Sequence, residues 1–386
     1  MTVVPFDQPT MDRLLTDAEV DIVVGTTKHN VQYLLGGYRY FFFANMDAIG
    51  LSRYLPALGY VRNAPTRAFY VGCGNEDWGT EVHTPWVEDV RNTSWSSIDT
   101  ARSVAAALRE RGLSEATVAV EMSFIPADCL DTLRVELPGA RFVDAQKLLE
   151  ALRAVKSADE LQLVREASEQ IISSMLATFD EVKPGMTRHE IVERFRRHQT
   201  NRGLVFDYCL IATGPSLNRA PSEEVWQPRS VLSLDSGGMF QGYIGDLARM
   251  AVHGEPTALM VDLMDQLESV QQAVRTVVRA GTRGGDLFTA ADEQLRRCGH
   301  RADMKFVAHG MGLITHEVPR MTSTGPVPYP GDHENSPLQA GNVLSIESWV
   351  EDPTVGFVKL EDTLIVTPGG WEAPGDRGRG YNVIGA

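Results

Sequence analysis

The alternation of short apolar runs with amphipathic segments across residues 1–150 predicts an α/β domain. VDIVVG at 20–25, which follows a helical segment, and RAFYVG at 67–72 have the length and β-branched content of buried strands. ATVAVE at 116–121 and ARFVDA at 140–145 predict two more strands. Between these pairs, DTARSVAAALRERG at 99–112 places alanine and leucine at helical spacing. Helices that alternate with strands are typical of α/β domains.

A long helical pattern opens the second half of the chain. Apolar residues recur at helical spacing over 148–182, with an interruption at Ser157, which forms a capping box with Glu160. Thr187 and Glu190 form the next capping box. The remainder is rich in strands and contains one further helix, predicted at 257–280. This pattern predicts an α+β domain.

No Gly/Pro-rich linker separates the two halves, so the onset of the long helical pattern sets the boundary. We expect domains at 1–155 and 156–386, in agreement with the length of 386 residues. A hydrophobic fraction of 43% with 23% charged residues is that of a globular protein with a sizeable core.

Charge and segment length exclude several classes of partner. The net charge of −15 repels nucleic acid and anionic membranes. The apolar stretches are shorter than the ~20 residues that span a bilayer, and the N-terminal sequence lacks a signal-peptide pattern. The four cysteines show no CxxC spacing, which favours reduced thiols. We expect a cytoplasmic protein without a nucleic-acid or membrane partner.

The segment 231–252 contains two aspartates among apolar strand residues. It predicts two strands joined by a Gly-rich turn, with Asp235 near the end of the first strand and Asp246 in the second. Burying an unpaired carboxylate costs several kcal/mol. Two such groups side by side repel each other unless a cation lies between them. The alternatives are a metal site and a pair of surface aspartates at strand ends.

Three later stretches contain further candidate ligands. His309 and His316 lie in FVAHGMGLITHEVPR, Glu347 lies in SIESW, and Glu361 lies in VKLEDTLIV. A single histidine is more often structural, and a single buried glutamate more often pairs with a base. A domain is expected to bury almost no carboxylates, however, so their accumulation here favours a metal site.

The donor types indicate the metal. Four carboxylates and one histidine are too many ligands for one zinc ion and too rich in oxygen for a soft metal. They suit two divalent ions ~3.5 Å apart that activate water and polarise a carbonyl. Manganese, cobalt and iron fit these ligands best, and zinc is a further candidate. His316, outside the ligand set, is placed to hydrogen-bond an oxyanion or to transfer a proton.

These residues together resemble the creatinase/prolidase/aminopeptidase P family (M24) of pita-bread metallohydrolases. The family pattern matches Asp235 and Asp246 eleven residues apart, His309 in HGMGLITHEVP, Glu347, and Glu361 in KLED. VKSADELQLVREAS, VKPGMTRHEI and YLLGGY (33–38) are also similar to family stretches, so the resemblance covers nearly the whole chain.

The resemblance implies a creatinase-like α/β N-terminal domain followed by an α+β pita-bread catalytic domain. It implies a homodimer in which the partner's N-terminal domain closes part of the active site. The implied activity is hydrolysis of an amide-type C–N bond in a small substrate, as in Xaa-Pro dipeptidase or aminopeptidase P. His316 would assist, and Glu347 would be both a ligand and the group that takes and passes a proton.

The chain departs from the family pattern next to the expected ligands. ATGPSLNRAPSEE at 212–224 lacks an active-site histidine of the family peptidases; Ser222 or a neighbour takes its place. Ala248 stands where a threonine is usual, and Ser348 where a proline is usual. Lys359 replaces an arginine, and a lysine pairs as a point charge rather than as a bidentate fork.

Five residues are candidate substrate contacts. Arg219, together with Asn218, could line the pocket in place of the missing histidine, and Arg249 and Lys359 lie beside the ligands in sequence. Tyr38 and Arg39 belong to the aromatic stretch 38–43, whose rings either line the site or pack in the core. A ring cage would suit a quaternary ammonium, whereas Arg39 would favour a carboxylate.

Two other interpretations stay open beside a peptidase. The first is a non-peptide enzyme on the same site, either an amidohydrolase similar to creatinase or ectoine hydrolase or a dimethylsulfoniopropionate lyase. The second is a non-catalytic peptide-binding protein, because some members of the fold serve as peptide- or histone-binding domains. Such members lose metal ligands, whereas this chain retains all five matching positions.

Overall fold

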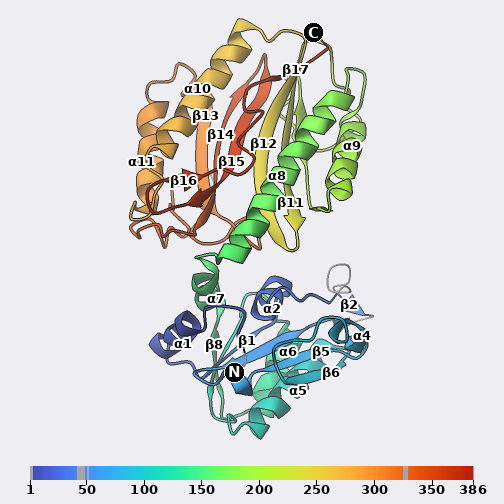
Figure 1. Ribbon diagram of the computed structural model, residues 1–386, viewed down its shortest axis with the longest axis vertical. Helices are drawn as coiled ribbons and strands as arrows, with labels where there is room; N and C mark the ends of the chain where they lie inside the picture. The colour runs from blue at the N-terminus through green and yellow to red at the C-terminus, as the bar shows by residue number, and fades with distance from the viewer. Residues whose placement is uncertain (1–2, 41–47, 50–51, 325–328, 386) are drawn as a thin grey trace. The chain divides into compact units, whose positions relative to one another are not determined.

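A mixed sheet of six strands organises Met1–Leu152, the first of two units in the computed structural model (Figure 1). The strand order is β6-β5-β4-β1-β7-β8. The structure describes residues 3–40, 48, 49, 52–324 and 329–385. Residues 41–43 of the predicted aromatic stretch therefore lie outside the described residues.

The central strand of this sheet is the predicted VDIVVG strand. β1 (Ile22–Gly25) is buried along its whole length. It pairs antiparallel with β4 (Ala57–Val61) and parallel with β7 (Thr117–Val120). β5 (Phe69–Cys73), β6 (Asp89–Ser94) and β8 (Arg141–Asp144) complete the sheet, and β2 (Ala48–Ile49) pairs with β3 (Ser52–Arg53).

Helices alternate with these strands, so the predicted α/β class is confirmed. The predicted helix at 99–112 is α5, and Ser96 caps it by accepting a hydrogen bond from the Asp99 amide. Its apolar residues pack in one core with the strands. The helices of this unit are α1 (Gln8–Asp17), α2 (Lys28–Leu34), the 3-10 helix η1 (Pro65–Arg67), α4 (Asp77–Thr80), α5 (Ser97–Glu110), α6 (Ala127–Glu136) and α7 (Gln146–Arg153).

A sheet of nine strands organises the second unit, Arg153–Ala386. Six of them follow the order β10-β11-β12-β15-β14-β13, and each neighbouring pair is antiparallel. These strands are β10 (Leu210–Thr213), β11 (Val231–Phe240), β12 (Tyr243–His253), β13 (Met304–Gly310), β14 (Val343–Asp352) and β15 (Gly356–Val366). Three short strands pair beside this path: β9 (Val205–Phe206), β16 (Trp371–Glu372) and β17 (Asn382–Ile384).

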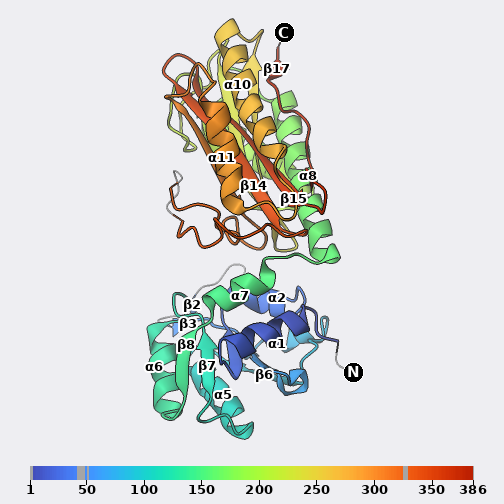
Figure 2. The same cartoon turned by 90° about the vertical axis from the view of Figure 1, so that its left-hand side faces the viewer.

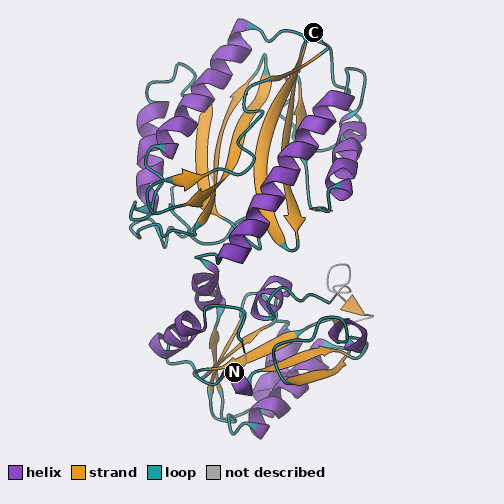
Figure 3. Cartoon of the chain, in the orientation of Figure 1, coloured by secondary structure: helices purple, strands orange, loops and turns teal. Residues whose placement is uncertain are grey.

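Two pairs of helices pack against this sheet, which confirms the predicted α+β class (Figures 2 and 3). α8 (Ala158–Glu181) and α9 (Arg188–Asn201) share a core with β10–β12. α10 (Ala258–Arg275) and α11 (Gly284–Leu295) share a second core with β12–β15. The capping boxes predicted at the starts of α8 and α9 are both present.

Strand alternation separates the helix-covered side of the sheet from a polar side. Successive side chains of a strand point to opposite faces. In β15, Leu360 and Leu364 belong to the helix-side core, so Lys359 and Glu361 lie on the other face. The same alternation in β14 places Ile346 in the core and Glu347 opposite. The polar face therefore collects the candidate ligands.

The β11–β12 hairpin differs from its prediction. The turn lies at Gln241 and Gly242, whose φ angles are 49° and 90°, as in the tight hairpin turns that need two positive φ values. Gly237, predicted in the turn, lies inside β11 and pairs with Asp246. Asp235 is therefore in the middle of its strand rather than near its end.

The sequence patterns did not predict α2, α4, α6 or α11. α6 buries only Cys129 and Leu133, too few positions to show a period. α11 begins with two glycines, Gly284 and Gly285, which have low helix propensity. No helix among the described residues is long and apolar enough to cross a membrane.

Candidate metal centre

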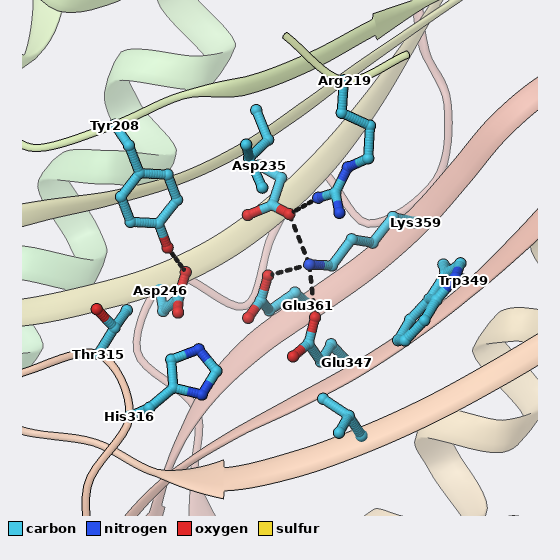
Figure 4. A pocket seen from close by; sticks show the side chains of 12 residues that line it. Tyr208, Arg219, Asp235, Asp246, Thr315, His316, Glu347, Trp349, Lys359 and Glu361 are labelled. Carbon is cyan, nitrogen blue, oxygen red and sulfur yellow. Dashed lines mark hydrogen bonds and ion pairs between the residues drawn. The ribbon is translucent and has the colours of Figure 1, made fainter. Parts of the chain in front are cut away.

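A cavity of about 410 Å³ opens on the polar face of the second sheet. Most of its polar lining comes from strands and from the segment that follows β13 (Figure 4). The lining residues are Tyr208, Leu210, Arg219, Asp235, Asp246, Val307, Thr315, His316, Glu347, Trp349, Lys359 and Glu361.

Strand register brings the four predicted carboxylate ligands together. Asp235 and Glu361 are both cross-strand partners of Ala248, one on each side of β12. Glu347 lies directly opposite Glu361 in the β14–β15 pair. Asp246 precedes Ala248 by two residues in β12, so its side chain lies on the same face of the sheet. All four side chains belong to residues that are at most 9% exposed.

These carboxylates and two histidines form three overlapping groups of potential metal donors. The donor atoms within each group lie within 4.8 Å of one another. The structure therefore brings all five predicted ligands to one place. The groups are Asp235, Asp246 and Glu361; His309, Glu347 and Glu361; and Asp246, His309 and His316.

His309 has the bonding pattern of a metal-ligating histidine. Its Nδ1 lies 3.2 Å from the Gly310 carbonyl oxygen, which can only accept, so Nδ1 carries the proton and Nε2 carries the lone pair in the neutral ring. Nε2 is buried and has no hydrogen-bond partner among the described residues. The carboxylate oxygen Oε1 of Glu347 is 3.6 Å from Nε2. A buried acceptor of this kind calls for a ligand, and a divalent cation fits it.

The electrostatics of the centre favour an added cation. Burial and the charge of Asp235 raise the pKa of Asp246 to about 7. Burial and Asp246 raise the pKa of Glu361 well above its ordinary value. Burial acts in the same direction on Glu347, but the charge of Lys359 outweighs it and lowers the Glu347 pKa. Excess buried negative charge of this kind is relieved by a divalent ion.

Lys359 lies among three of the carboxylates rather than beside one of them. Its Nζ is 2.6 Å from Asp235 Oδ2, 2.6 Å from Glu347 Oε2 and 2.8 Å from Glu361 Oε2. Figure 4 shows the ammonium at the point where these side chains meet. Burial alone would lower the pKa of Lys359, but the three carboxylates raise it well above its ordinary value.

Arg219 occupies the cavity edge in the altered segment 212–224. Its guanidinium pairs with Asp235 Oδ2 and lies 4.3 Å from the ring centre of Phe357. Asn218 and Ser222 bond within their own loop instead: Asn218 Oδ1 accepts from the Ala220 amide, and Ser222 Oγ accepts from the Glu224 amide. Of this segment, Arg219 is the residue that lines the cavity.

His316 stacks on His309. The ring centres are 3.8 Å apart and the planes differ by 17°. His316 Nδ1 contacts the hydroxyl of Tyr329, a residue that the sequence patterns did not indicate. Burial and the neighbouring His309 lower the pKa of His316 to about 4. The predicted catalytic histidine therefore lies at the cavity as a neutral ring at neutral pH.

Two further cavity residues were missed from the sequence. Tyr208 donates a hydrogen bond of 2.7 Å to Asp246 Oδ1. A Cβ atom at position 237 would lie 2.8 Å from the Tyr208 ring, so Gly237 makes this approach possible. Trp349 follows Glu347 by two residues, a spacing that places both on one face of a strand and that could have identified it. Tyr208 precedes its strand and offered no such signal.

Arg249 was predicted as a substrate contact, and this prediction is wrong. Its side chain is fully buried on the helix side of the sheet. It donates to Asp362 Oδ1 at 2.8 Å, to the Gly375 carbonyl at 3.0 Å and to the Glu361 carbonyl at 2.8 Å. These bonds give Arg249 a structural role.

Tyr38 and Arg39 belong to the Met1–Leu152 unit. The Tyr38 hydroxyl donates to Glu76 Oε1 at 2.8 Å. Burial lowers the pKa of Arg39. A role of either residue in substrate binding stays a prediction.

The candidate centre combines buried carboxylates with His309, whose Nε2 has no hydrogen-bond partner among the described residues, and with the neutral ring of His316. These features define a candidate centre of a divalent-metal hydrolase. Comparison with protein families identifies the class further. Residues 162–368 match the model of metallopeptidase family M24, and residues 10–155 match the creatinase/prolidase N-terminal domain. The chain belongs to metallopeptidase family M24 and is a metallohydrolase.

Individual relatives agree with this assignment, and solved structures share the fold. The Xaa-Pro dipeptidase of Lactobacillus helveticus is 23% identical over 302 residues, which cover 74% of this chain and 80% of that protein. The Xaa-Pro dipeptidase structure from Bacillus anthracis superimposes with a TM-score of 0.79 at 18% identity and covers 97% of this chain and 99% of that one. The N-terminal domain of the FACT complex subunit SPT16 from Cicer arietinum has a TM-score of 0.71 at 14% identity, covering 96% and 97%. The pita-bread fold predicted from the sequence is thereby confirmed.

Proposed function

We propose that this protein is a divalent-metal-dependent hydrolase that cleaves an amide-type C–N bond in a small substrate, as an Xaa-Pro dipeptidase or aminopeptidase P does. The observation that supports this most directly is the convergence of four buried carboxylates on His309, whose Nε2 lacks a hydrogen-bond partner among the described residues. The similarity to Xaa-Pro dipeptidases supports the substrate class.

The proposed ligands are Asp235, Asp246, His309, Glu347 and Glu361. A bound divalent cation would polarise the scissile carbonyl and lower the pKa of an attacking water. The two donor groups that share Glu361 agree with the two ions predicted from the sequence, although Lys359 competes for the same oxygens. Manganese is the expected metal, with cobalt, iron and zinc as alternatives.

The remaining groups bind substrate and handle protons. Glu347 faces the cavity and takes a proton from the attacking water, which it then passes to the leaving nitrogen. His316 lies at the cavity and hydrogen-bonds the oxyanion. Tyr208 holds Asp246 in place. Arg219, at 29% side-chain exposure, is the basic group through which the cavity receives an anionic end of a substrate.

The second candidate is a non-peptide enzyme on the same centre, such as a creatinase-like or ectoine-hydrolase-like amidohydrolase or a dimethylsulfoniopropionate lyase. The observation that favours it is Arg219, which lines the cavity from the segment where family peptidases carry a histidine. A leaving amine that depends on that histidine would lack its proton donor here. A non-catalytic peptide-binding role is opposed by the presence of all five candidate ligands.

The test is a substrate panel with purified, manganese-loaded protein. It contains Xaa-Pro dipeptides, creatine, ectoine and dimethylsulfoniopropionate, each with and without a chelator. Chelator-sensitive release of proline from the dipeptides would support the first candidate, and turnover of another panel member would replace it with the second. A folded protein that binds no divalent metal would contradict both. The homodimer and the cytoplasmic location stay predictions.

A further inference from the structure

The ammonium of Lys359 lies among three carboxylates that a second metal ion would need as ligands. Nζ contacts one oxygen each of Asp235, Glu347 and Glu361 at 2.6–2.8 Å. A compact ammonium with three donors can be surrounded by carboxylate oxygens as a metal ion is, whereas a planar guanidinium cannot. Lys359 therefore does more than replace the usual arginine of the family pattern.

Glu347 divides its two oxygens between Lys359 and His309. Oε2 binds the ammonium at 2.6 Å, while Oε1 faces the unpartnered Nε2 of His309 at 3.6 Å. That separation is too long for a hydrogen bond. A carboxylate that bridges two cation positions has this arrangement, and here one of the positions is filled by a side chain of the protein itself.

One oxygen of Asp235 is occupied by protein cations at the same end of the centre. Its Oδ2 pairs with both Arg219 and Lys359. When all four carboxylates are ionised, as a bound metal requires of its ligands, they carry four negative charges against the two positive charges of Lys359 and Arg219. One divalent ion would neutralise the remaining charge. His309 Nε2, which has no hydrogen-bond partner in the part of the chain that the structure describes, lies 3.6 Å from Oε1 of Glu347, the oxygen that Lys359 does not contact.

We propose that Lys359 takes the place of one of the two metal ions, so that the centre holds one divalent ion per chain, bound by Asp246, His309, Glu347 and Glu361. This inference rests on the proposed metal-dependent function and changes the expected number of ions from two to one. Asp235 is then a partner of Lys359 and Arg219 rather than a metal ligand.

The test measures bound manganese in the 386-residue chain. Metal-free protein is loaded with Mn²⁺ and dialysed, and bound metal is counted by inductively coupled plasma mass spectrometry. Electron paramagnetic resonance then distinguishes an isolated ion from an exchange-coupled pair. The variants are Lys359→Gln, Asp235→Asn and His309→Gln, and circular dichroism confirms that each is folded.

The wild type is expected to bind about one ion per chain, with the spectrum of an isolated ion, and Lys359→Gln about two, as a coupled pair. Asp235→Asn should keep its single ion, and His309→Gln should lose it.

Two coupled ions in the wild type would overturn this inference and leave the proposed function intact. A single ion in folded Lys359→Gln would show that Lys359 does not exclude the second. If Lys359→Gln does not fold, the number of ions bound by the wild type and by Asp235→Asn still tests the one-ion proposal. A two-ion centre would bind two ions per chain in the wild type. No bound metal in the wild type would overturn the proposed function itself.

Discussion

Lys156 and Glu317 form a buried ion pair, with 2.8 Å between Lys156 Nζ and Glu317 Oε1 and both side chains 1% exposed. Arg153 binds the other oxygen of Glu317 at 3.1 Å. Glu317 directly follows His316, so the segment that begins the second unit holds the backbone next to the predicted catalytic histidine. The burial of Glu317 raises its pKa, but Lys156 and Arg153 outweigh this effect and lower it.

Replacing Lys156 with methionine should destabilise the protein and displace His316. Removing one partner of a buried pair costs ~3–5 kcal/mol, and the lower end is expected because Arg153 remains. Denaturant unfolding measures the loss. The matched control is Arg196→Ala, which breaks an exposed pair with Glu193 and should leave the free energy of unfolding nearly unchanged. Equal stability of the two variants would contradict the structural role of the buried pair.

Replacing Tyr208 with phenylalanine should weaken metal binding. The substitution removes the hydrogen bond to Asp246 Oδ1 and leaves the ring in place. Loss of a group that orients a metal ligand typically costs ~10–100-fold in metal affinity or activity. Titration with Mn²⁺ measures the affinity. Tyr243→Phe is the control, because the hydrogen bond that it removes goes to Glu160 Oε1 rather than to a candidate ligand. This variant should bind Mn²⁺ normally. A similar weakening of metal binding in both variants would refute the role of Tyr208.

Replacing Asp246 with alanine should abolish turnover with little change in fold. The substitution removes a candidate ligand and a buried charge together, and its carboxylate belongs to two of the three donor groups. We expect a loss of at least ~10²-fold in kcat, the scale of one lost electrostatic contributor. Kinetics on the identified substrate and circular dichroism check both parts. Full turnover in this variant would show that the centre has been assigned to the wrong residues.

Stability should fall in acid partly through Asp362. Burial raises the pKa of Asp362, but Arg249, Arg379 and Arg275 outweigh it and hold the pKa well below its ordinary value. The unfolded-state pKa of an aspartate is ~3.9, so the stabilisation is complete above about pH 5. It is lost as the pH falls below the unfolded-state pKa toward the lower folded-state pKa.

The variant Asp362→Asn isolates this contribution. It should be less stable than the wild type at neutral pH, and the difference in free energy of unfolding should shrink as the pH decreases below ~4. Denaturant unfolding at several pH values measures it. Asp292→Asn alters an exposed aspartate and serves as the control. A difference that stays constant with pH would contradict the assigned charge of Asp362.

The candidate ligands could be predicted from the sequence because carboxylates are rare inside apolar strands. Glu347 and Glu361 interrupt the apolar pattern of their strands, and their match to a family pattern predicts that they belong to one centre. The same local rule also explains the error at Arg249. It follows Asp246 by three residues, and an odd spacing along a strand puts the second side chain on the opposite face.

Contacts between distant strands could not be predicted from the same patterns. The spacing of two from Glu361 placed Lys359 on the site face, but nothing in the sequence showed that Nζ reaches Asp235, which precedes it by 124 residues. Tyr208 precedes a short strand, and its approach to Asp246 depends on the missing side chain of Gly237. Such contacts follow from register and close packing, which local patterns do not encode.

The alternation of side chains along β15 places the adjacent residues Glu361 and Asp362 in two different electrostatic environments. Glu361 faces the cavity, whereas Asp362 faces the helix side and is bound there by Arg249, Arg275 and Arg379. The charge of Asp362 is neutralised on its own side of the sheet and adds nothing to the demand for a cation on the other. The chain can therefore place an arginine cluster one residue away from Glu361, with the guanidinium groups paired to Asp362 rather than to the candidate ligands.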